Sequence, residues 1–205
     1  MIKYIISAVL LCSTAFAQDT IKLNTKNTVL FNKQVAPITV MIVSVDLYMK
    51  RVALPKEETL YLVLESGGGE VGAGLEFINF ARQIPNLKVI CTYCGSMAGA
   101  IFEMIEAPRL VTDKSIMLMH EMKLVITAKE LTPEEVINFK KESDEFDKIF
   151  YSIIGCSKED YERMITNKDW VVQGSDILIL KLADEKVKLK CDKKLTKKTP
   201  KTCKE

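Results

Sequence analysis

Two neighbouring stretches of the sequence decide the fold: residues 59–82 (TLYLVLESGGGEVGAGLEFINFAR) and residues 87–105 (LKVICTYCGSMAGAIFEMI). Each begins with a short run of large apolar residues, which is typical of a strand buried on both faces of a parallel sheet. A glycine-containing turn follows each run, and a helical pattern follows each turn. This order indicates an α/β protein in which the carboxyl ends of the strands carry the functional residues.

The same alternation continues over residues 25–185, which contain no internal repeat or linker. Further strands are predicted at residues 28–31, 109–112, 115–119 and 185–189, and further helices at residues 36–53, 132–154, 157–166 and 174–182. The helix over residues 36–53 has an apolar face at helical spacing, formed by Ile38, Met41, Ile42, Val45 and Met49. The pattern as a whole predicts a mostly parallel sheet covered on both faces.

Composition excludes several classes of protein. With 205 residues, 48% of them hydrophobic and 27% charged, the chain has the size and make-up of one folded α/β domain. Its net charge of +2 gives no electrostatic footprint for nucleic acid, and no nucleic-acid partner is expected. A single His excludes the catalytic zinc centres that need two or three of them.

Residues 1–17 (MIKYIISAVLLCSTAFA) are typical of a signal peptide and not of the folded protein. Lys3 gives a positive start, an apolar run follows, and Ala15 and Ala17 form a small-x-small cleavage site. The run is too short to span a bilayer. We expect cleavage after Ala17 and export of residues 18–205, so that the protein is periplasmic or secreted; the alternative is an uncleaved anchor.

Export matters for the cysteines, because disulfides form in oxidising compartments. The exported chain keeps five of them: Cys91, Cys94, Cys156, Cys191 and Cys203. Five is odd, so at least one is left over or pairs between chains. Cys191 and Cys203, which bracket a Lys-rich segment, are the predicted pair. Cys91-x-x-Cys94 is open to three interpretations: a redox or metal-binding motif, small core thiols, or a local disulfide.

Charge is distributed unevenly along the chain. Residues 186–205 hold nine Lys and two acidic residues, a charge of +7, which leaves −6 for residues 18–185 once Lys3 is counted. We therefore divide the chain into a signal peptide (1–17), a folded domain (18–185) and a Lys-rich tail (186–205). The tail is either solvated or a binding segment for a membrane surface, nucleic acid or an acidic partner.

Three features lie where predicted strands end. Gly67–Gly69 allow backbone N–H groups to point at a phosphate or an oxyanion, the alternative being a tight turn. Ser96 lies where a strand enters a helix, so its hydroxyl is either a nucleophile or a helix cap. His120 is a general base or a structural residue. A catalytic triad also needs a carboxylate, and composition alone does not select one.

Four blocks within residues 26–187 resemble the proteolytic subunit of the Clp protease, in the ClpP/crotonase superfamily. Residues 64–74 (LESGGGEVGAG) are similar to the family's N-S-P-G-G-x-V-x-A-G, and residues 95–100 (GSMAGA) to A-S-M-A/G-A, which carries the nucleophile. Residues 116–121 (IMLMHE) are similar to I-M-I-H-Q, which carries the base, and residues 167–184 to the block that carries the triad Asp. The order and spacing of the four blocks agree with the family.

The resemblance implies a fold of repeated β-β-α units with a protruding handle helix, here residues 132–154. It implies a Ser96–His120–Asp169 triad, with an oxyanion hole formed by the backbone of Gly68, Gly69 and Met97. It also implies a serine endopeptidase that needs no metal or organic cofactor and binds unfolded proteins or peptides as an added strand. Family members assemble as two stacked heptameric rings, so a homo-oligomer is expected.

The sequence departs from the family at several positions. Gly67 stands in place of Pro and Glu65 in place of Asn, and Lys123–Ile126 replace a Gly-rich segment. The ATPase partners of the family work in the cytosol, so export argues against such a partner here. Two alternatives stay open: a non-catalytic scaffold with the same fold, and a signal-peptide-peptidase-like protease with Ser96 and a Lys base, for which Lys123 is the nearest candidate.

Overall fold

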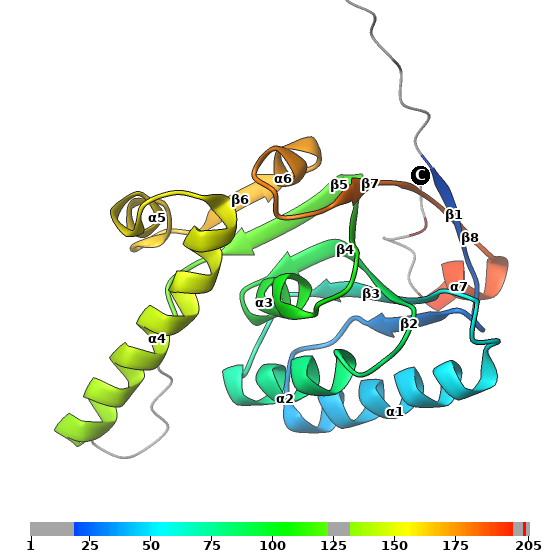
Figure 1. Ribbon diagram of the computed structural model, residues 1–205, viewed down its shortest axis with the longest axis horizontal. Coiled ribbons are helices and arrows are strands. Elements are labelled where there is room, and N and C mark those ends of the chain that lie inside the picture. The colour runs from blue at the N-terminus through cyan, green and yellow to red at the C-terminus, as the bar shows by residue number, and fades with distance from the viewer. Residues whose placement is uncertain (1–18, 123–131, 199–202, 204–205) are drawn as a thin grey trace, which may run out of the picture.

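A central sheet organises the protein, as predicted for the α/β class (Figure 1). The computed structural model describes residues 19–122, 132–198 and 203. The strands of the sheet lie in the order β2 (Thr28–Phe31), β3 (Leu60–Ser66), β4 (Leu87–Gly95), β5 (Arg109–Met119) and β6 (Trp170–Gln173). All neighbouring pairs are parallel except β5 and β6.

Three helices connect the parallel strands: α1 (Pro37–Ala53), α2 (Val71–Ala81) and α3 (Met97–Met104). In Figure 1, α1 and α2 lie below the sheet, and α3 is drawn at the height of β3 and β4. Right-handed connections between adjacent strands place successive helices on the same face of a sheet. The main core lies between that face and the helices, where Phe31 and Phe77 meet edge to face at 5.1 Å between ring centroids. Residues at alternate positions of β3, such as Leu62 and Leu64, point into it.

The opposite face of the sheet is covered by the two ends of the described chain. β1 (Thr20–Leu23) pairs in parallel with β8 (Lys188–Cys191), α7 (Lys193–Lys198) follows, and β7 (Glu185–Lys186) pairs with β5. A second apolar cluster forms there from Leu23, Val63, Ile90, Leu110, Val187, Leu189 and Leu195. The sheet is thus covered on both faces, as predicted, and this second face is covered mainly by strands.

The Lys-rich segment after residue 185 is not a solvated tail over its described part. Val187, Leu189 and Leu195 are buried, and the lysines between them point outward. The predicted disulfide between Cys191 and Cys203 is present and closes the segment back on itself. These few apolar residues anchor a segment whose average composition is hydrophilic, so composition alone does not reveal that it packs on the sheet.

The long helix α4 (Pro133–Ile154) projects away from the sheet, at the left of Figure 1. Its first turn is closed by a capping box between Thr132 and Glu135, and it ends at Gly155 in the left-handed conformation (φ 73°). α5 (Lys158–Ile165) and α6 (Ser175–Ile179) follow. Phe150 of α4 stacks on Tyr161 of α5 at 6.3 Å, which holds the end of α4 nearest to the sheet.

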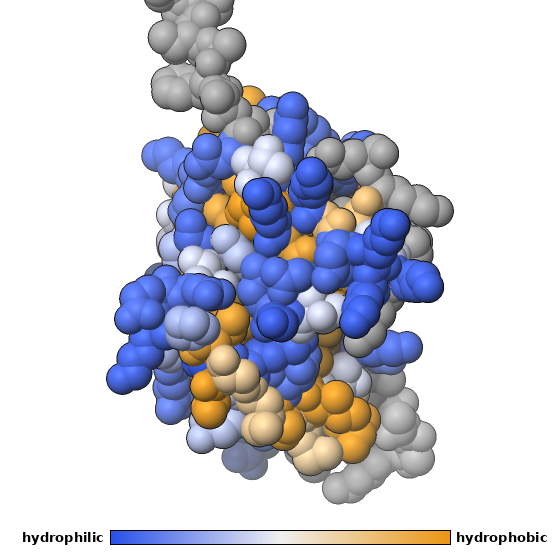
Figure 2. All heavy atoms as spheres, turned by 90° about the vertical axis from the view of Figure 1, so that its right-hand side faces the viewer, coloured by the Kyte–Doolittle hydropathy of each residue, from blue (hydrophilic) through white to orange (hydrophobic). Residues whose placement is uncertain are grey.

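The bounds of helix α1 agree with the predicted 36–53 to within one residue, but its predicted apolar stripe does not face the core. The predicted stripe residues are each more than half exposed: Ile38, Met41, Ile42, Val45 and Met49. The buried face consists of Val40, Val43, Leu47 and Arg51. The helix is apolar on two sides, so periodicity alone does not say which side packs on the sheet. Figure 2, which shows the β1–β8 end of the molecule, is hydrophilic over most of its area and apolar near its lower edge, the side on which α1 lies in Figure 1.

The predicted signal peptide, residues 1–17, lies outside the described residues. No helix in the described ranges is both long enough and apolar enough to cross a membrane.

The packing of the Lys-rich segment predicts a specific stability effect. Leu195→Ala removes a fully buried side chain, so we expect the free energy of unfolding to fall by about 2 kcal/mol or more. Lys194→Ala, at the exposed neighbouring position, is the matched control and is expected to change it by less than about 0.5 kcal/mol. Equal effects of the two substitutions in urea titrations would show that the segment does not pack on the sheet.

Candidate active site

The three strand-end features predicted from the sequence meet in one groove. The glycine turn follows β3, Ser96 follows β4 and His120 follows β5, and these three strands are neighbours in the sheet. The groove has a volume of about 680 Å³. Its described lining is Asn32, Lys33, Gln34, Glu65, Ser66, Gly67, Gly68, Gly69, Val71, Ser96, His120 and Met122. The parallel sheet therefore brings together residues that are far apart in the sequence.

Ser96 sits at the tip of a sharp turn between β4 and α3. Its backbone has φ 49° and ψ −123°, a conformation that costs a residue with a side chain of order 1–3 kcal/mol. Its N–H donates to the carbonyl of Leu118 on β5 at 2.8 Å, which holds the turn against the strand that carries His120. Its hydroxyl does not cap α3. The helix-cap interpretation of Ser96 is thereby set aside, and the turn presents the hydroxyl to the groove.

The glycine turn lies directly against the Ser96 turn. A Cβ placed on Gly68 would lie 2.7 Å from the Ser96 Cβ, 2.7 Å from the Met97 nitrogen and 2.6 Å from the Gly95 oxygen. Gly68 also has φ +93°, which residues with side chains rarely adopt. Glycine is therefore required at position 68 for two reasons, and the more informative one is the close approach of its backbone to Ser96.

The backbone N–H groups expected to form an oxyanion hole are in different situations. The Gly68 N–H donates to Ser66 Oγ at 3.2 Å. Gly69 pairs with Val35, but the hydrogen bonds involve its neighbours: the Val35 N–H donates to the Gly68 oxygen at 2.8 Å, and the Glu70 N–H donates to the Val35 oxygen at 2.9 Å. In such a parallel bridge the central residue directs its own N–H to the opposite side, which for Gly69 is the side away from Val35.

Met97 supplies the second N–H, at the first position of α3. The N–H groups of a helix's first turn have no partner within the helix and carry its positive dipole end. The Met97 N–H is thus available beside Ser96, where an acyl oxygen would gain negative charge. Gly69 and Met97 are the better-placed pair of donors.

The hydrogen bonding of His120 fixes its tautomer. Its Nδ1 lies 2.6 Å from the backbone oxygen of Glu121. A carbonyl oxygen only accepts hydrogen bonds, so the neutral ring carries its proton on Nδ1 and its lone pair on Nε2. This is the form of the imidazole that can remove a proton from a serine hydroxyl. Sequence reasoning missed the Glu121 carbonyl, because no motif marks a backbone acceptor.

Asp169 is brought to the same strand end as His120 but does not form a hydrogen bond with it. Met119 pairs with Trp170 in the antiparallel β5–β6 ladder, so Asp169 stands opposite His120 one step beyond it. The turn before β6 is tied to the same place, because the Asn167 N–H donates to Glu121 Oε2 at 3.1 Å. Among described residues, however, no hydrogen bond joins Asp169 to His120, and Asp169 is exposed.

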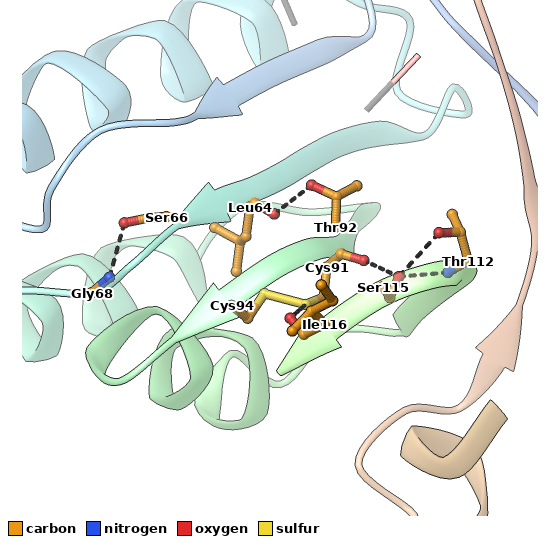
Figure 3. Close-up of a disulfide and its surroundings, with 9 residues drawn as sticks. All are labelled: Leu64, Ser66, Gly68, Cys91, Thr92, Cys94, Thr112, Ser115 and Ile116. Atoms are coloured by element: carbon orange, nitrogen blue, oxygen red, sulfur yellow. Dashed lines mark hydrogen bonds between the residues drawn. A yellow bond between two sulfur atoms is a disulfide. The ribbon is translucent and has the colours of Figure 1, made fainter. Parts of the chain in front are cut away.

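Irregular pairing of β4 and β5 sets the direction in which these strand ends point (Figure 3). Relative to β3, Thr92 is an extra residue of β4. On the other side of β4, residues 112–115 of β5 lie opposite this one residue. Side chains satisfy the interrupted backbone: the Thr92 hydroxyl donates to the Leu64 oxygen at 3.0 Å, and the Ser115 hydroxyl to the Cys91 oxygen at 2.6 Å. Bulges of this kind re-aim the residues that follow them, here Ser96 and His120.

A disulfide between Cys91 and Cys94 closes the β4 bulge (Figure 3). The two Cα atoms are 5.9 Å apart, whereas three residues of regular strand span about 10 Å. Both cysteines are fully buried. Of the interpretations left open by the sequence, the local disulfide is the one that the structure contains, and the metal-binding and exposed redox motifs do not fit buried, paired sulfurs.

A buried ion-pair cluster joins the helix after Ser96 to the strand before His120. Arg109 of β5 pairs with Glu103 of α3 and, at 2.9 Å, with Asp184. Burial raises the pKa of Glu103 to about 8, although the Arg109 guanidinium opposes that shift. Losing Arg109 would leave the Glu103 carboxyl buried without its hydrogen-bond partner, so the cluster holds α3 and β5 in one arrangement.

Within the described residues, no group of three or more His, Cys, Asp or Glu side chains is placed to hold a metal ion. Lys123, the base of the alternative Ser–Lys mechanism, lies outside the described residues.

The comparisons with known proteins identify no family for this chain. No protein-family model matches it, and no curated protein is significantly similar to it.

The close approach of the glycine turn to Ser96 can be tested by substitution. Gly68→Ala places a methyl group where Ser96 and Met97 already lie, and we expect it to lower the free energy of unfolding by more than about 1 kcal/mol. Gly72→Ala is the matched control, because a Cβ there meets nothing within 4 Å and alanine favours the helix by up to about 1 kcal/mol. Similar thermal unfolding of wild type and Gly68→Ala would contradict the contact.

Proposed function

We propose that this protein is an exported ClpP-like serine endopeptidase that hydrolyses peptide bonds of unfolded proteins or peptides. One observation carries the proposal: an uncapped serine on a strained strand-to-helix turn, pressed against a glycine backbone and sharing a groove with a histidine whose Nε2 holds the lone pair. A positioned serine nucleophile, a general base and backbone N–H donors for the oxyanion are the groups that acyl transfer requires.

In this mechanism Ser96 Oγ attacks the carbonyl carbon of the peptide bond, and His120 Nε2 takes the hydroxyl proton. The N–H groups of Gly69 and Met97 stabilise the oxyanion, each such donor contributing about 2.7–4 kcal/mol in related chemistry. His120 then gives its proton to the leaving amine, which leaves an acyl-enzyme on Ser96. Water activated by His120 hydrolyses the ester and restores the serine.

Asp169 is proposed to orient His120 and to stabilise the imidazolium that forms. For this role its carboxylate replaces the Glu121 carbonyl as the acceptor of the Nδ1 proton. The change is local, because the β5–β6 register already places the two residues at the same strand end. The carboxylate is the stronger partner once the ring is charged.

The substrate is proposed to lie extended along the groove. The ends of β2 and β3 contribute Asn32, Lys33 and Glu65 to the lining, beside the glycine turn. Backbone recognition of an added strand gives affinity with loose side-chain specificity, which suits unfolded chains. The scheme needs neither a metal ion nor an organic cofactor.

We also propose that the chain works as a homo-oligomer in the periplasm or medium, with α4 as the family's handle and no ATPase partner. The exposed stripe of α1 supports self-association. It consists of Ile38, Met41, Ile42, Val45, Tyr48, Met49 and Val52. Each of these side chains is more than half exposed, and a contiguous apolar stripe of this kind is typical of a protein–protein interface.

A non-catalytic scaffold is the second candidate function. The observation that favours it is that, among the described residues, Asp169 forms no hydrogen bond with His120, whose Nδ1 is bound instead to the backbone oxygen of Glu121. In a scaffold this arrangement is permanent, whereas in an enzyme it changes on substrate binding or assembly. Activity measurements separate the two.

Hydrolysis of an unfolded protein substrate tests the proposed function. We expect wild type to cleave reduced, carboxymethylated lactalbumin, Ser96→Ala to lose all cleavage, and His120→Ala to be slower by about 100-fold or more. Ser175→Ala, an exposed serine away from the groove, is the control and retains the wild-type rate. Cleavage that persists in Ser96→Ala contradicts the assignment, and no cleavage by assembled wild type favours the scaffold.

Self-association through α1 is tested by placing a charge in the stripe. We expect wild type to sediment as an oligomer and Val45→Glu to sediment as a monomer, because an interface that buries a carboxylate without a partner is destabilised by several kcal/mol. Lys56→Glu, exposed but outside the stripe, is the control and is expected to leave the oligomer intact. A wild-type protein that is monomeric at high concentration would contradict this proposal.

A further inference from the structure

A second, narrower cavity opens beside Ser96 and runs toward α4. Its volume is about 40 Å³, room for about three water-sized groups when one water needs roughly 10–15 Å³. Ser96 and His120 lie at one side of it. Its other walls are mostly apolar and include Met97, Met119, Met122, Phe146, Phe150 and Tyr161.

Asp147 of α4 is the one acidic residue among the described residues that line this cavity. None of the ion pairs between described residues involves it. The nearby cation, Lys158 of α5, is instead paired with Asp144 at 3.0 Å and Glu162 at 3.6 Å. A half-buried carboxylate that lines a mostly apolar cavity thus has no ion-pair partner among the described residues.

The charged groups around Asp147 leave the region negative. Asp144 of α4, Glu162 of α5 and Glu121 after β5 raise the pKa of Asp147, Lys158 lowers it, and burial is the largest cause of the shift. Together they raise that pKa to about 6. Asp147 is therefore ionised at neutral and alkaline pH. This ionisation costs free energy because the carboxylate is half-buried among like charges, and a cation entering the cavity would offset that cost.

We propose that this cavity takes the substrate side chain on the amino side of the cleaved bond, and that Asp147 selects a lysine there. The inference rests on the proposed peptidase function and adds a specificity to it. In the acyl-enzyme, the residue that carries the acyl carbon on Ser96 Oγ has its side chain directly beside that serine. The cavity that adjoins Ser96 is the place for it.

The shape and chemistry of the cavity favour lysine over other side chains. Lysine has a narrow, unbranched apolar stem and a compact ammonium that pairs with a carboxylate. Its first two methylenes lie in the adjoining groove, and the outer two methylenes with the ammonium are the three groups for which the cavity has room. The guanidinium of arginine is planar and wider. The stacked rings of Phe150 and Tyr161 add a face on which an ammonium group is attracted.

The test compares two peptide substrates that differ only in the side chain before the scissile bond: lysine, or its uncharged isostere with a pentyl side chain. At pH 8 we expect wild type to cleave the lysine peptide at least tenfold faster, since a hydrogen bond between charged groups contributes about 1.5–3 kcal/mol. Asp147→Asn is expected to lose most of that ratio. Glu145→Gln removes the same charge from an exposed position of α4 and is expected to keep it.

Two further measurements complete the test. The folded pKa of Asp147 lies above its unfolded value, so ionisation destabilises the fold as pH rises through about 6, and Asp147→Asn is expected to be at least as stable as wild type at pH 8. The lysine preference of wild type is expected to shrink at pH 5, where Asp147 is protonated. Folding of the variant is checked by circular dichroism.

The outcomes distinguish this inference from the function on which it rests. Equal cleavage of the two peptides by wild type, or an unchanged ratio in Asp147→Asn, overturns the lysine selectivity and leaves the peptidase standing. No cleavage of either peptide, together with no labelling of wild type by a simple alkyl fluorophosphonate, overturns both.

Discussion

The contact between Gly68 and the Ser96–Met97 backbone is the constraint on which the candidate site depends. It requires a residue without a side chain, a left-handed backbone at Gly68 and a strained backbone at Ser96, all within two adjacent turns. Two tight turns alone do not require such a close approach of their backbones. The contact brings the backbone N–H groups of Gly69 and Met97 close to the Ser96 hydroxyl, an arrangement suited to stabilising developing negative charge.

The sheet supports this contact through controlled irregularity. Three features determine where β4 and β5 end: the extra residue of β4, the bulge opposite it in β5, and the buried Cys91–Cys94 disulfide. The Glu103–Arg109–Asp184 cluster then fixes α3 to β5 behind the site. Ser96 and His120 are thus positioned by the core and not by loops, which is the usual requirement for a preorganised site.

Much of this could be predicted from the sequence, and the failures have physical reasons. Buried strands and glycine turns were predicted because apolar runs and glycines act locally. The side of α1 that packs on the sheet was not predicted. Met41 and Val43 lie on two apolar sides of this helix, and only the tertiary structure determines which side is buried. β1 and β6 were missed because they are short, and their pairing partners lie far away in the sequence. The Asp169–His120 contact depends on side-chain placement, which no sequence motif fixes.

The central claim is that Ser96 and His120 form an activated nucleophile and base. Its most direct test is the intact mass of the assembled protein after treatment with an alkyl fluorophosphonate, followed by peptide mapping of the adduct. We predict one adduct, located on Ser96, which is absent in Ser96→Ala and strongly slowed in His120→Ala. No adduct on the assembled wild-type protein, or an adduct on another residue, would contradict the account.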